Sequence, residues 1–278
     1  MKKFLVLLTA LGFATGLTVT AQASPEDDLK VFQGYFKKKF PNVPFDDFAN
    51  GVYALDKQAR GDWEAIMAFP PYEIELEMGK KIWETPFKNG KTFAGCFRNG
   101  GAKIAQHYPY YDEATKEVRT IEMDINACLK KNGEEEYKNL AVGDMARVAG
   151  YFKSLSAGER VKLDLSSPGA REWYERGKQF YWARRGQLNF ACASCHVESA
   201  SKFIRGDSLS AGLGHGVGFP VYRAKGGAMQ TLHNRYRGCN SQVRAKPFGF
   251  QSAEYRALEL YETYMSTGLP LVAPSYRR

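Results

Sequence analysis

The stretch FACASCHVES, which runs from Phe190 to Ser199, contains the pattern that decides the fold. Cys192 and Cys195 are separated by two residues, and His196 follows directly. Two thiols at this spacing can each form a thioether with a vinyl group of one haem, and the adjacent imidazole then lies under the iron as its proximal ligand. A redox-active cysteine pair would not need the histidine, and a zinc site would need a second ligand pair, which the sequence lacks. The stretch therefore predicts covalently bound haem of the c type.

The first residues, MKKFLVLLTALGFATGLTVTAQA, have the layout of a secretory signal peptide. Lys2 and Lys3 form a basic start, an apolar run follows, and the small-residue site A-Q-A ends at residue 23. A membrane anchor is the alternative, but Thr and Gly residues interrupt the apolar run. We therefore expect residues 1–23 to be removed and the mature chain to be exported, which together with haem c indicates a bacterial periplasm. No later stretch is long and apolar enough to span a bilayer.

About 255 residues remain after residue 23, which is enough for two domains with cores of their own. The formal net charge is +9 at pH 7 and becomes +7 without Lys2 and Lys3. This positive charge is scattered rather than gathered in one block. It fits a plain basic surface, or else an anionic substrate or an acidic partner. No nucleic-acid-binding motif is present, so we expect no nucleic acid partner.

Two halves of the chain share one order of features. EMGKKIW…NGKTFAGC, residues 77–96, matches ERGKQFY…RGQLNFACASC, residues 175–195. Later in each half, YFKSLSAG at residues 151–158 matches YETYMSTG at residues 261–268. Each half thus has a helix start with Gly and Lys, a loop that leads through Phe-Ala to a cysteine, and a closing amphipathic helix. This shared order predicts an internal duplication.

Apolar residues at three- and four-residue spacing predict helices at residues 144–155, 167–183 and 252–265. Loops rich in Gly and Pro lie between them, notably AGLGHGVGFP at residues 211–220, and strand signals are sparse. Residues 41–71 are expected to form an irregular lead-in that packs on the first half.

The expected fold class is mainly α: two cytochrome c-like domains with long loops, of which only the C-terminal one carries haem. The N-terminal domain would span residues 24–158 and the C-terminal haem domain residues 159–278, with the linker near residues 156–167. Helices with long loops fit small c-type cytochrome domains, in which the haem itself fills much of the core.

The first half lacks the haem-binding residues of the second. Cys96 is followed by Phe-Arg-Asn-Gly, where a haem site would need a second Cys and a His. The simplest interpretation is a Cys96–Cys128 disulfide in a domain without haem, which would stabilise the fold by roughly 3–4 kcal/mol in the chain-entropy model. Two free thiols are the alternative. His107 is either a relic ligand or an ordinary surface residue.

The iron of a c-type haem usually takes a second axial ligand, for which the second half offers several candidates. They are Met229, Met265, His215, His233 and Cys239. From generic frequency, Met229 or a histidine would lead, whereas Met265 lies in the last expected helix and is more typical of a core residue.

Cys239 lies in the basic segment HNRYRGCN and is the odd cysteine among five in a chain expected to be exported. Arg235 and Arg237 precede it and Arg244 follows it. Cationic neighbours favour the thiolate, which is both the nucleophile and the metal ligand. In a helix Arg235 and Cys239 would share one face, although Gly238 weakens the expectation of a full helix. The alternative is an inert thiol, with the arginines bound to haem propionates or to solvent.

With these features the chain resembles SoxA, the larger subunit of the SoxAX cytochromes of bacterial sulfur oxidation. The resemblance covers the mature chain and rests on the two cytochrome-like halves, the C-x-x-C-H motif at residues 192–196 and the R-x-R-G-C stretch at residues 235–239. The second stretch is the more specific element, because many cytochromes share C-x-x-C-H. Some family members carry two haems; the first half here lacks the motif, so the chain resembles the single-haem type with a disulfide instead.

The resemblance implies an enzyme, an L-cysteine S-thiosulfotransferase that joins thiosulfate to a cysteine of the carrier protein SoxYZ. It implies that Cys239 and Arg235 are the catalytic residues: Cys239 binds the iron and is found as a persulfide, and Arg235 binds the substrate. One haem c would be held by Cys192, Cys195, His196 and Cys239, with His196 and Cys239 as the metal ligands. The implied partners are SoxX, a small monohaem cytochrome, and SoxYZ.

Simple chemistry agrees with these roles. Thiosulfate is a dianion that repels a thiolate, and a guanidinium at about 4 Å contributes on the order of 4 kcal/mol against a unit charge at an effective dielectric constant of about 20. Joining two sulfurs oxidatively releases two electrons, whereas one haem iron takes one at a time, so a second acceptor is needed. The competing hypotheses are an electron-transfer cytochrome without bond-forming activity, and a sensor or scavenger that holds sulfane sulfur on Cys239.

Overall fold

The computed structural model describes residues 23–278, so the predicted signal peptide lies outside the described residues except for its last position. The α-helices are α1 (Pro25–Lys39), α2 (Lys57–Met67), α3 (Glu73–Glu84), α4 (Ile121–Lys131), α5 (Asp144–Ser154), α6 (Pro168–Trp182), α7 (Leu232–Gln242) and α8 (Ala253–Met265). Shorter helical turns are η1 (Phe45–Ala54), η2 (Phe93–Cys96), η3 (Arg98–Gly101), η4 (Ala105–His107), η5 (Ser194–Glu198) and η6 (Ala224–Gly226). None of these described helices combines the length and the apolar composition of a bilayer-spanning segment.

The three helices predicted from apolar spacing are present as α5, α6 and α8, and each end lies within one residue of the prediction. Serine hydroxyls begin two of them. Ser167 accepts a hydrogen bond from the N–H of Ala170 at 3.2 Å, and Ser252 accepts one from the N–H of Tyr255 at 3.4 Å. These side chains satisfy backbone donors that the first helical turn leaves unpaired, so the starts of α6 and α8 are set by local sequence.

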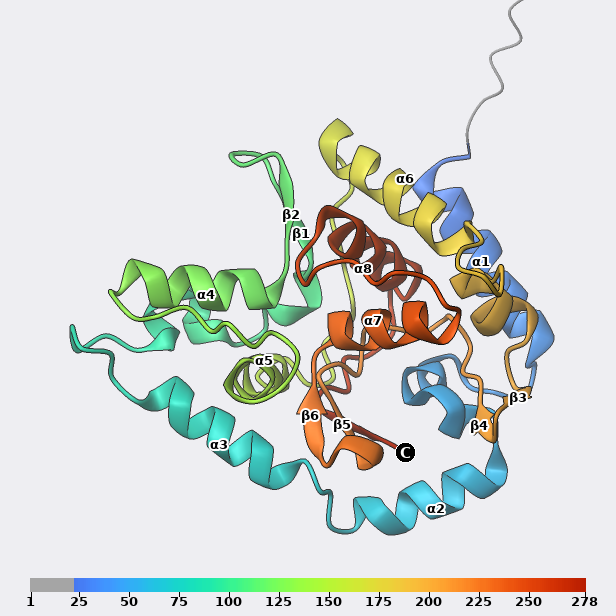
Figure 1. Cartoon of the computed structure of the whole chain (residues 1–278), viewed down its shortest axis with the longest axis horizontal. Coiled ribbons are helices and arrows are strands. Elements are labelled where there is room, and N and C mark those ends of the chain that lie inside the picture. Colours follow the sequence, from blue (N-terminus) through green and yellow to red (C-terminus); the bar gives the residue numbers. More distant parts are fainter. Residues whose placement is uncertain (1–22) are drawn as a thin grey trace, which may run out of the picture.

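The same helix crossing occurs once in each half: α3 packs on α5, and α6 packs on α8 (Figure 1). A glycine lies at each crossing. A Cβ added to Gly79 would lie 2.2 Å from the carbonyl oxygen of Arg147, and one added to Gly177 would lie 2.0 Å from that of Ala257. These are the glycines of the repeated Glu-x-Gly-Lys segment, and in both halves they allow the two backbones to approach. This shared feature supports the internal duplication.

The N-terminal helix covers the second half rather than the first. α1 runs alongside α6 in Figure 1. Gln33 donates to the carbonyl oxygen of Thr267 at 2.9 Å, just beyond the end of α8, and Asp28 pairs with Lys178 of α6 at 2.5 Å. The first helix of the described chain therefore stabilises the half that contains the cysteine motif.

The lead-in at residues 41–71 differs from the prediction. It is not irregular, because it forms η1 and α2, and it contacts the second half and the linker. Arg277, near the C-terminus, donates to the carbonyl oxygen of Ala49 at 3.3 Å, and Arg160 of the linker donates to Asp46 at 2.9 Å. These contacts join residues more than one hundred positions apart, so no local pattern could reveal them.

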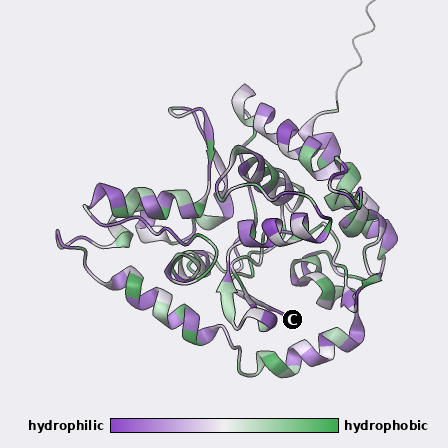
Figure 2. Cartoon of the chain, viewed as in Figure 1, coloured by the Kyte–Doolittle hydropathy of each residue, from purple (hydrophilic) through white to green (hydrophobic). Residues whose placement is uncertain are grey.

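The strands are short and form small separate sheets, in agreement with the sparse strand signals. They are β1 (Tyr110–Asp112), β2 (Glu117–Arg119), β3 (Phe203–Ile204), β4 (Asp207–Ser208), β5 (Val221–Arg223), β6 (Ala228–Gln230) and β7 (Ser275–Arg277). β1–β2 and β3–β4 are hairpins, and the third sheet has the order β6–β5–β7, in which β7 is parallel to β5. Hydrophilic and hydrophobic residues alternate along the outer helices, as expected for helices with one buried face (Figure 2).

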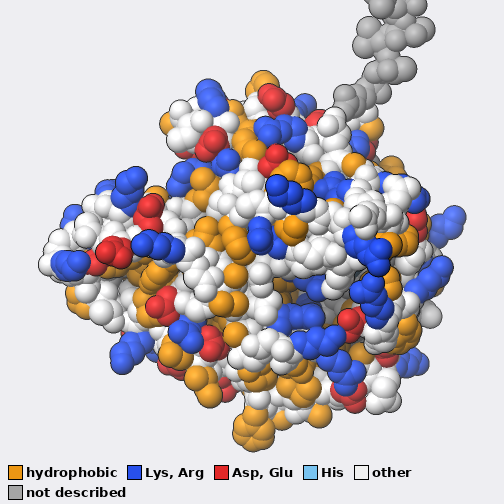
Figure 3. Space-filling view, viewed as in Figure 1, with side chains coloured by type: hydrophobic (Ala, Val, Ile, Leu, Met, Phe, Trp, Pro, Cys, Tyr) orange, Lys and Arg blue, Asp and Glu red, His pale blue; other side chains and the backbone are white. Residues whose placement is uncertain are grey.

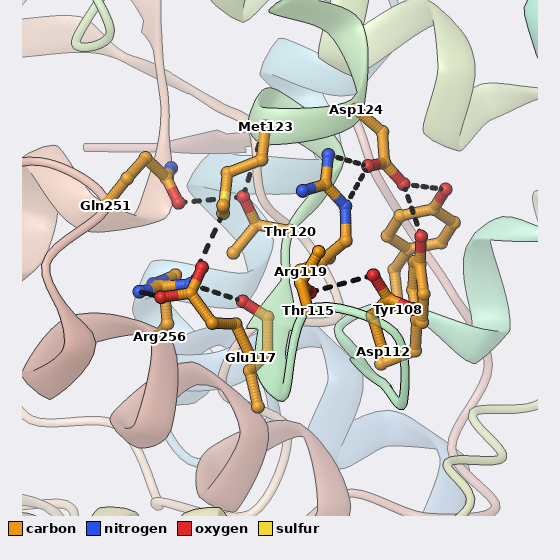
Figure 4. A network of polar contacts seen from close by, with 12 residues as sticks. Tyr108, Asp112, Thr115, Glu117, Arg119, Thr120, Met123, Asp124, Gln251 and Arg256 are labelled. Atoms are coloured by element: carbon orange, nitrogen blue, oxygen red, sulfur yellow. Dashed lines mark hydrogen bonds and ion pairs between the residues drawn. The ribbon is translucent and has the colours of Figure 1, made fainter. Parts of the chain in front are cut away.

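A polar network at the β1–β2 hairpin joins the two halves (Figure 4). Glu117 of β2 pairs with Arg256 of α8 at 3.1 Å, and the hydroxyl of Thr120, next to α4, donates to Gln251 at 2.8 Å. Arg256 is almost fully buried, so its charge depends on this pairing and on the ring of Trp173, 5.0 Å away. The hairpin thus fixes α4 relative to α8.

The predicted disulfide is present and links η2 to α4 through Cys96 and Cys128, with the two Cα atoms 5.8 Å apart. The side chain of Asn132 donates to the carbonyl oxygen of Cys128 at 2.8 Å and holds the end of α4 against the bridge. A cavity of about 590 Å³ adjoins the disulfide. His107 lines this cavity, and its Nδ1 lies 2.8 Å from the carbonyl oxygen of Lys162. In the order of the repeat, Cys96 of this bridge corresponds to the cysteine motif of the second half.

Candidate haem site

The cysteine motif lies on a short, wide helical turn. Cys192 begins the turn, which continues as the π-helical segment η5. The hydroxyl of Ser194 accepts a hydrogen bond from the N–H of Ala191 at 3.2 Å and closes the start of the turn. π-Helical turns are rare and frequently occur at functional sites. The turn brings Cys192, Cys195 and His196 together on one compact piece of backbone.

His196 is held in the orientation that a metal ligand requires. Its Nδ1 lies 3.0 Å from the carbonyl oxygen of Ser210, which can only accept a hydrogen bond, so Nδ1 carries the proton and Nε2 is left with a free lone pair. Burial lowers the pKa of His196 well below its ordinary value, and the neighbouring His215 lowers it further. The imidazole is therefore neutral, which is the state that binds iron.

A chain of hydrogen bonds leads from His196 to α7. The hydroxyl of Ser210 lies 3.4 Å from Nδ1 of His196 and 3.1 Å from Nε2 of His215. Nδ1 of His215 lies 3.2 Å from Oε1 of Glu262, and the hydroxyl of Tyr236 donates to Oε2 of Glu262 at 2.5 Å. The segment that positions His196 is thus tied to the helix that carries the basic cysteine segment.

α7 runs without a break through Gly238, so the doubt that this glycine raised about a full helix was unfounded. No atom lies within 4 Å of a Cβ placed there, so the glycine is not needed for close packing. Arg235 and Cys239 are four residues apart in this helix and share one face. The side chains of both are partly exposed.

This face of α7 lies within electrostatic range of the cysteine motif. Burial raises the pKa of the Cys195 thiol, Cys239 adds to the rise, and Arg235 lowers the pKa. Burial also raises the pKa of Cys192, and Glu262 and Cys239 add to that rise. Cys239 therefore lies within electrostatic range of both motif sulfurs, and Arg235 lies within range of the Cys195 sulfur.

The two methionine candidates have other surroundings. Met229 is fully buried on β6, where its sulfur lies against α5 of the first half: a Cβ added to Gly150 would be 2.6 Å from Sδ. Met265 is buried near the end of α8, where the sequence predicted a core residue. The Met229 sulfur therefore packs on the first half of the chain.

The two histidine candidates are also engaged elsewhere. The ring of His215 lies 4.3 Å from the ring of His196 and belongs to the hydrogen-bond chain that supports it. His233 is 2% exposed, accepts a hydrogen bond from the N–H of Gln251 at 3.1 Å, and faces Glu259 at 3.1 Å. Among the candidate axial ligands, Cys239 is therefore the one that lies near the motif with no competing partner in residues 23–278.

Buried polar atoms beside the motif fit the presence of a further group. Within the described chain, the hydroxyl of Tyr181 and Nε of Arg185 are buried and have no hydrogen-bond partner. Tyr181 lies close enough to Cys192 and Cys195 to feel their charge, and Gly212 makes room for its hydroxyl, because a Cβ there would lie 2.3 Å away. Buried polar groups are rarely left unpaired, so these atoms mark a place where haem fits.

Several parts of this site carry no signal in the sequence. Ser210 and Glu262 lie 14 and 66 residues from His196, and Tyr236 is an ordinary helix residue by pattern. The basic composition around Cys239 pointed to α7, but nothing in the sequence pointed to the residues that orient His196. Their roles follow from the way the loop that contains Ser210 folds over η5 and from the packing of α7 and α8 beside that loop.

Comparison with known proteins agrees with the fold and the site. A family model described as SoxA/TsdA, cytochrome c domain, matches residues 78–161. The C-x-x-C-H motif, the neutral state of His196 and the match to this family model together define a cytochrome of the c type. Such a protein binds haem c covalently. A protein from Chlorobaculum tepidum named L-cysteine S-thiosulfotransferase subunit SoxA is 48% identical over 99% of this chain and 96% of its own length. The chain belongs to the SoxA family.

Two further relatives extend the comparison. A protein from Allochromatium vinosum with the same name is 45% identical over 99% of this chain and 98% of its own length. A solved structure described as SoxXA from P. pantotrophus is similar with a TM-score of 0.69 and 31% identity, and the match covers 75% of this chain and 79% of that one. The family assignment thus rests on sequence along nearly the whole chain and on the fold.

Proposed function

We propose that this chain is the catalytic cytochrome subunit that oxidatively joins thiosulfate to a cysteine of a SoxYZ-like carrier protein. It is thus an L-cysteine S-thiosulfotransferase that passes two electrons to c-type haem. The names of its close relatives support this function. The structural support is that Arg235 and Cys239 share one face of α7, within electrostatic range of Cys195 in the motif.

The reaction balances as an oxidative coupling. A bond forms between the terminal sulfur of thiosulfate and the sulfur of the carrier cysteine, the thiol proton is released, and two electrons leave. Arg235 binds the sulfonate end of the dianion, because its forked donors match two oxygens at once. Cys239 lies one helical turn away and offers its sulfur next to the bound anion. When bound, haem supplies a one-electron acceptor beside this sulfur, so a SoxX-like monohaem subunit is the proposed second acceptor.

We further propose that one haem c is bound in a C-terminal domain of residues 159–278. Cys192 and Cys195 would form the thioethers, and His196 and Cys239 would be the axial ligands. The N-terminal domain, residues 24–158, would carry no haem. The support is that Cys96 is already bonded to Cys128, so it is not available for a thioether.

The setting that we propose is the periplasm, reached by means of the signal peptide at residues 1–23. The support is the layout of that segment together with haem c chemistry. The proposed partners are the SoxX-like subunit, the SoxYZ-like carrier and thiosulfate, without nucleic acid and without a membrane span.

The test is a reconstituted assay. The holoprotein, purified with its SoxX-like subunit, is incubated with thiosulfate, a SoxYZ-like carrier and an electron acceptor, and the carrier is then weighed by intact-protein mass spectrometry. We expect acceptor reduction that depends on both thiosulfate and carrier, and a carrier mass increased by one thiosulfonate adduct. Acceptor reduction by other donors without any adduct would identify a plain electron-transfer cytochrome. Sulfur bound to Cys239 without transfer would identify a sensor or scavenger.

A further inference from the structure

Two arginines lie directly opposite each other at the edge of the third sheet. In the parallel pairing of β5 with β7, Arg223 is the register partner of Arg277. Residues paired in this way project from the same face of a sheet, and like charges in this arrangement destabilise it. The repulsion between the two guanidiniums must therefore be offset by groups outside the sheet.

Arg277 cannot move away from its neighbour. Its guanidinium donates to the carbonyl oxygens of Tyr276 at 2.9 Å and Ala49 at 3.3 Å, and it lies 5.3 Å from the ring of Tyr53. The pKa of Arg277 is lowered to about 10, mainly by burial; Tyr53 opposes this shift and Arg223 contributes to it. These contacts fix a partly buried positive charge behind Arg223.

Glycines make the space that Arg277 occupies. A Cβ added to Gly51 would lie 3.3 Å from Nη2 of Arg277, and one added to Gly218 would lie 3.4 Å from the same atom. Gly51 also has a positive φ of 65°, so a side chain there would be strained as well as crowded. The backbone on two sides is thus built around this guanidinium.

The side chain of Arg223 makes no ion pair and no hydrogen bond within residues 23–278. Burial lowers its pKa, Arg235 lowers it further, and Asp207 and Cys239 raise it. Asp207 has its own cation, Lys225, at 3.6 Å. Arg223 is therefore a half-buried cation within electrostatic reach of both Arg235 and Cys239, and its donors are free.

Arg223 links the other two arginines: it lies opposite Arg277 in the sheet and within electrostatic reach of Arg235. Figure 3 shows Lys and Arg side chains gathered in a hollow between α7 and the C-terminal end of the chain. In the described chain no carboxylate lies within ion-pair distance of Arg223, Arg235 or Arg277. Half-buried like charges without counter-ions are unfavourable, and a bound anion with two negative charges would relieve them.

We propose that Arg223 is a second anion-binding residue, which together with Arg235 holds the sulfonate group of thiosulfate beside Cys239. Arg277 is a positioning residue behind it. The inference rests on the proposed function and explains which anions the site would select. One guanidinium can neutralise half of a dianion, whereas two guanidiniums from different elements match its charge and fix its orientation. The site would thus prefer dianionic oxyanions to the monoanion hydrosulfide.

The experiment compares Arg223→Gln with Arg223→Lys and with the control Arg278→Gln. Arg278 is equally basic and lies next to Arg277, but it is already paired with Asp62 at 3.0 Å. In the reconstituted assay we expect Arg223→Gln to raise the KM for thiosulfate about 10- to 100-fold, the usual effect of losing one charge-assisted contact, with a much smaller change in kcat. Arg223→Lys should recover part of the loss, and Arg278→Gln should match the wild type.

Binding measurements separate this inference from the proposed function. Thiosulfate, and sulfate as an unreactive dianion, are titrated into the wild-type complex and into the Arg223→Gln complex by calorimetry. Weaker binding to the variant supports the anion site even if neither protein turns over. Equal binding and an unchanged KM overturn it, whatever the activity. The inference also fails if Arg223→Gln shifts the haem spectrum or midpoint potential while thiosulfate binding stays unchanged, because Arg223 would then be paired with haem propionates.

Discussion

The hydroxyl of Tyr236 donates a 2.5 Å hydrogen bond to Oε2 of Glu262, a carboxylate that is 4% exposed. The other oxygen of Glu262 faces His215, whose ring reaches Ser210 and, through it, His196. Tyr236 lies next to Arg235 in α7, so one buried carboxylate connects the helix of the proposed substrate residues with the segment that orients the proposed iron ligand.

We expect Tyr236→Phe to lower the free energy of unfolding by about 1.5–3 kcal/mol, because it leaves one oxygen of a buried, charged acceptor without its donor. Urea unfolding of the holoprotein, followed by circular dichroism, measures the loss. Tyr222→Phe is the control, since the Tyr222 ring stacks on Tyr276 and its hydroxyl makes no hydrogen bond in the described chain. Equal stability of the two variants would contradict the role given to the Tyr236–Glu262 pair.

Alanine at the crossing glycines should destabilise both halves. Gly177→Ala would place a Cβ 2.0 Å from the carbonyl oxygen of Ala257, and Gly79→Ala would place one 2.2 Å from that of Arg147, so the helices must separate. We expect each change to cost about 1–3 kcal/mol or more in urea unfolding, as overpacking does. Gly34→Ala in α1, where a Cβ meets no atom within 4 Å, should instead stabilise by about 0.5–1 kcal/mol. A loss at Gly34 as large as at Gly177 would show that the crossings are not special.

Cys239→Ala should leave haem covalently attached, since Cys192 and Cys195 are unchanged, but alter the low-spin spectrum and abolish carrier modification. Ultraviolet–visible and paramagnetic resonance spectra of the purified holoprotein measure the first effect, and the reconstituted assay measures the second. Ser241→Ala, an exposed change on the same helix, is the control. An unchanged spectrum in Cys239→Ala would mean that another side chain is the second axial ligand.

Arg235→Ala should lower thiosulfate-dependent turnover about 30- to 1000-fold, because it removes a charge-assisted contact to a desolvated anion. Arg235→Lys keeps the charge but loses the fork, so it should retain part of the activity. Arg237→Ala should stay near the wild type, since Arg237 donates to the carbonyl oxygen of Phe248 and lies 4.9 Å from the ring of Phe250.

Haem spectra control for structural damage in these arginine variants, because none of them removes a proposed iron ligand. Wild-type turnover in Arg235→Ala would exclude Arg235 as the anion site and leave Arg223 as the next candidate.

Glu122 should make stability depend on pH. Burial raises the pKa of this carboxyl above its ordinary value of 4.5, and the nearby Glu259 raises it further. The folded state therefore holds the proton more tightly than the unfolded state, so the free energy of unfolding falls as pH rises from about 4.5 through the raised pKa.

We expect Glu122→Gln to be more stable than the wild type at neutral pH and to show a smaller decline over this range. Urea unfolding between pH 4.5 and pH 8 tests both points. Glu136→Gln, a change at an exposed position, is the control. It should leave the decline of the unfolding free energy with pH unchanged. If Glu122→Gln shows the same decline as the wild type, other groups govern the pH dependence.

Features that depend on neighbours in sequence were predictable. The spacing of Cys192, Cys195 and His196 identified the haem motif, and apolar periodicity identified α5, α6 and α8. The repeated Glu-x-Gly-Lys segment indicated the duplication, and the helix crossings at Gly79 and Gly177 now give its physical reason. The disulfide followed from the unmatched Cys96 and Cys128 and is present.

The irregular structure predicted for the lead-in was wrong, because this segment depends on residues that are distant in sequence. Residues 41–71 were expected to be irregular, yet they form η1 and α2 and contact residues near the C-terminus. Helical turns of this length gain little from intrinsic propensity, so their stability comes from tertiary packing that a local pattern does not encode.

By itself, the sequence determined which residues could carry the chemistry: the haem motif, a basic cysteine segment and the family to which they belong. Tertiary structure alone decided how these parts are supported. It placed the carbonyl oxygen of Ser210 on His196 and set Arg223 of β5 opposite Arg277 of β7. The physical reason is that a covalent motif and a helical face are set by spacing along the backbone, whereas hydrogen-bond partners and charge clusters are set by which distant segments pack together.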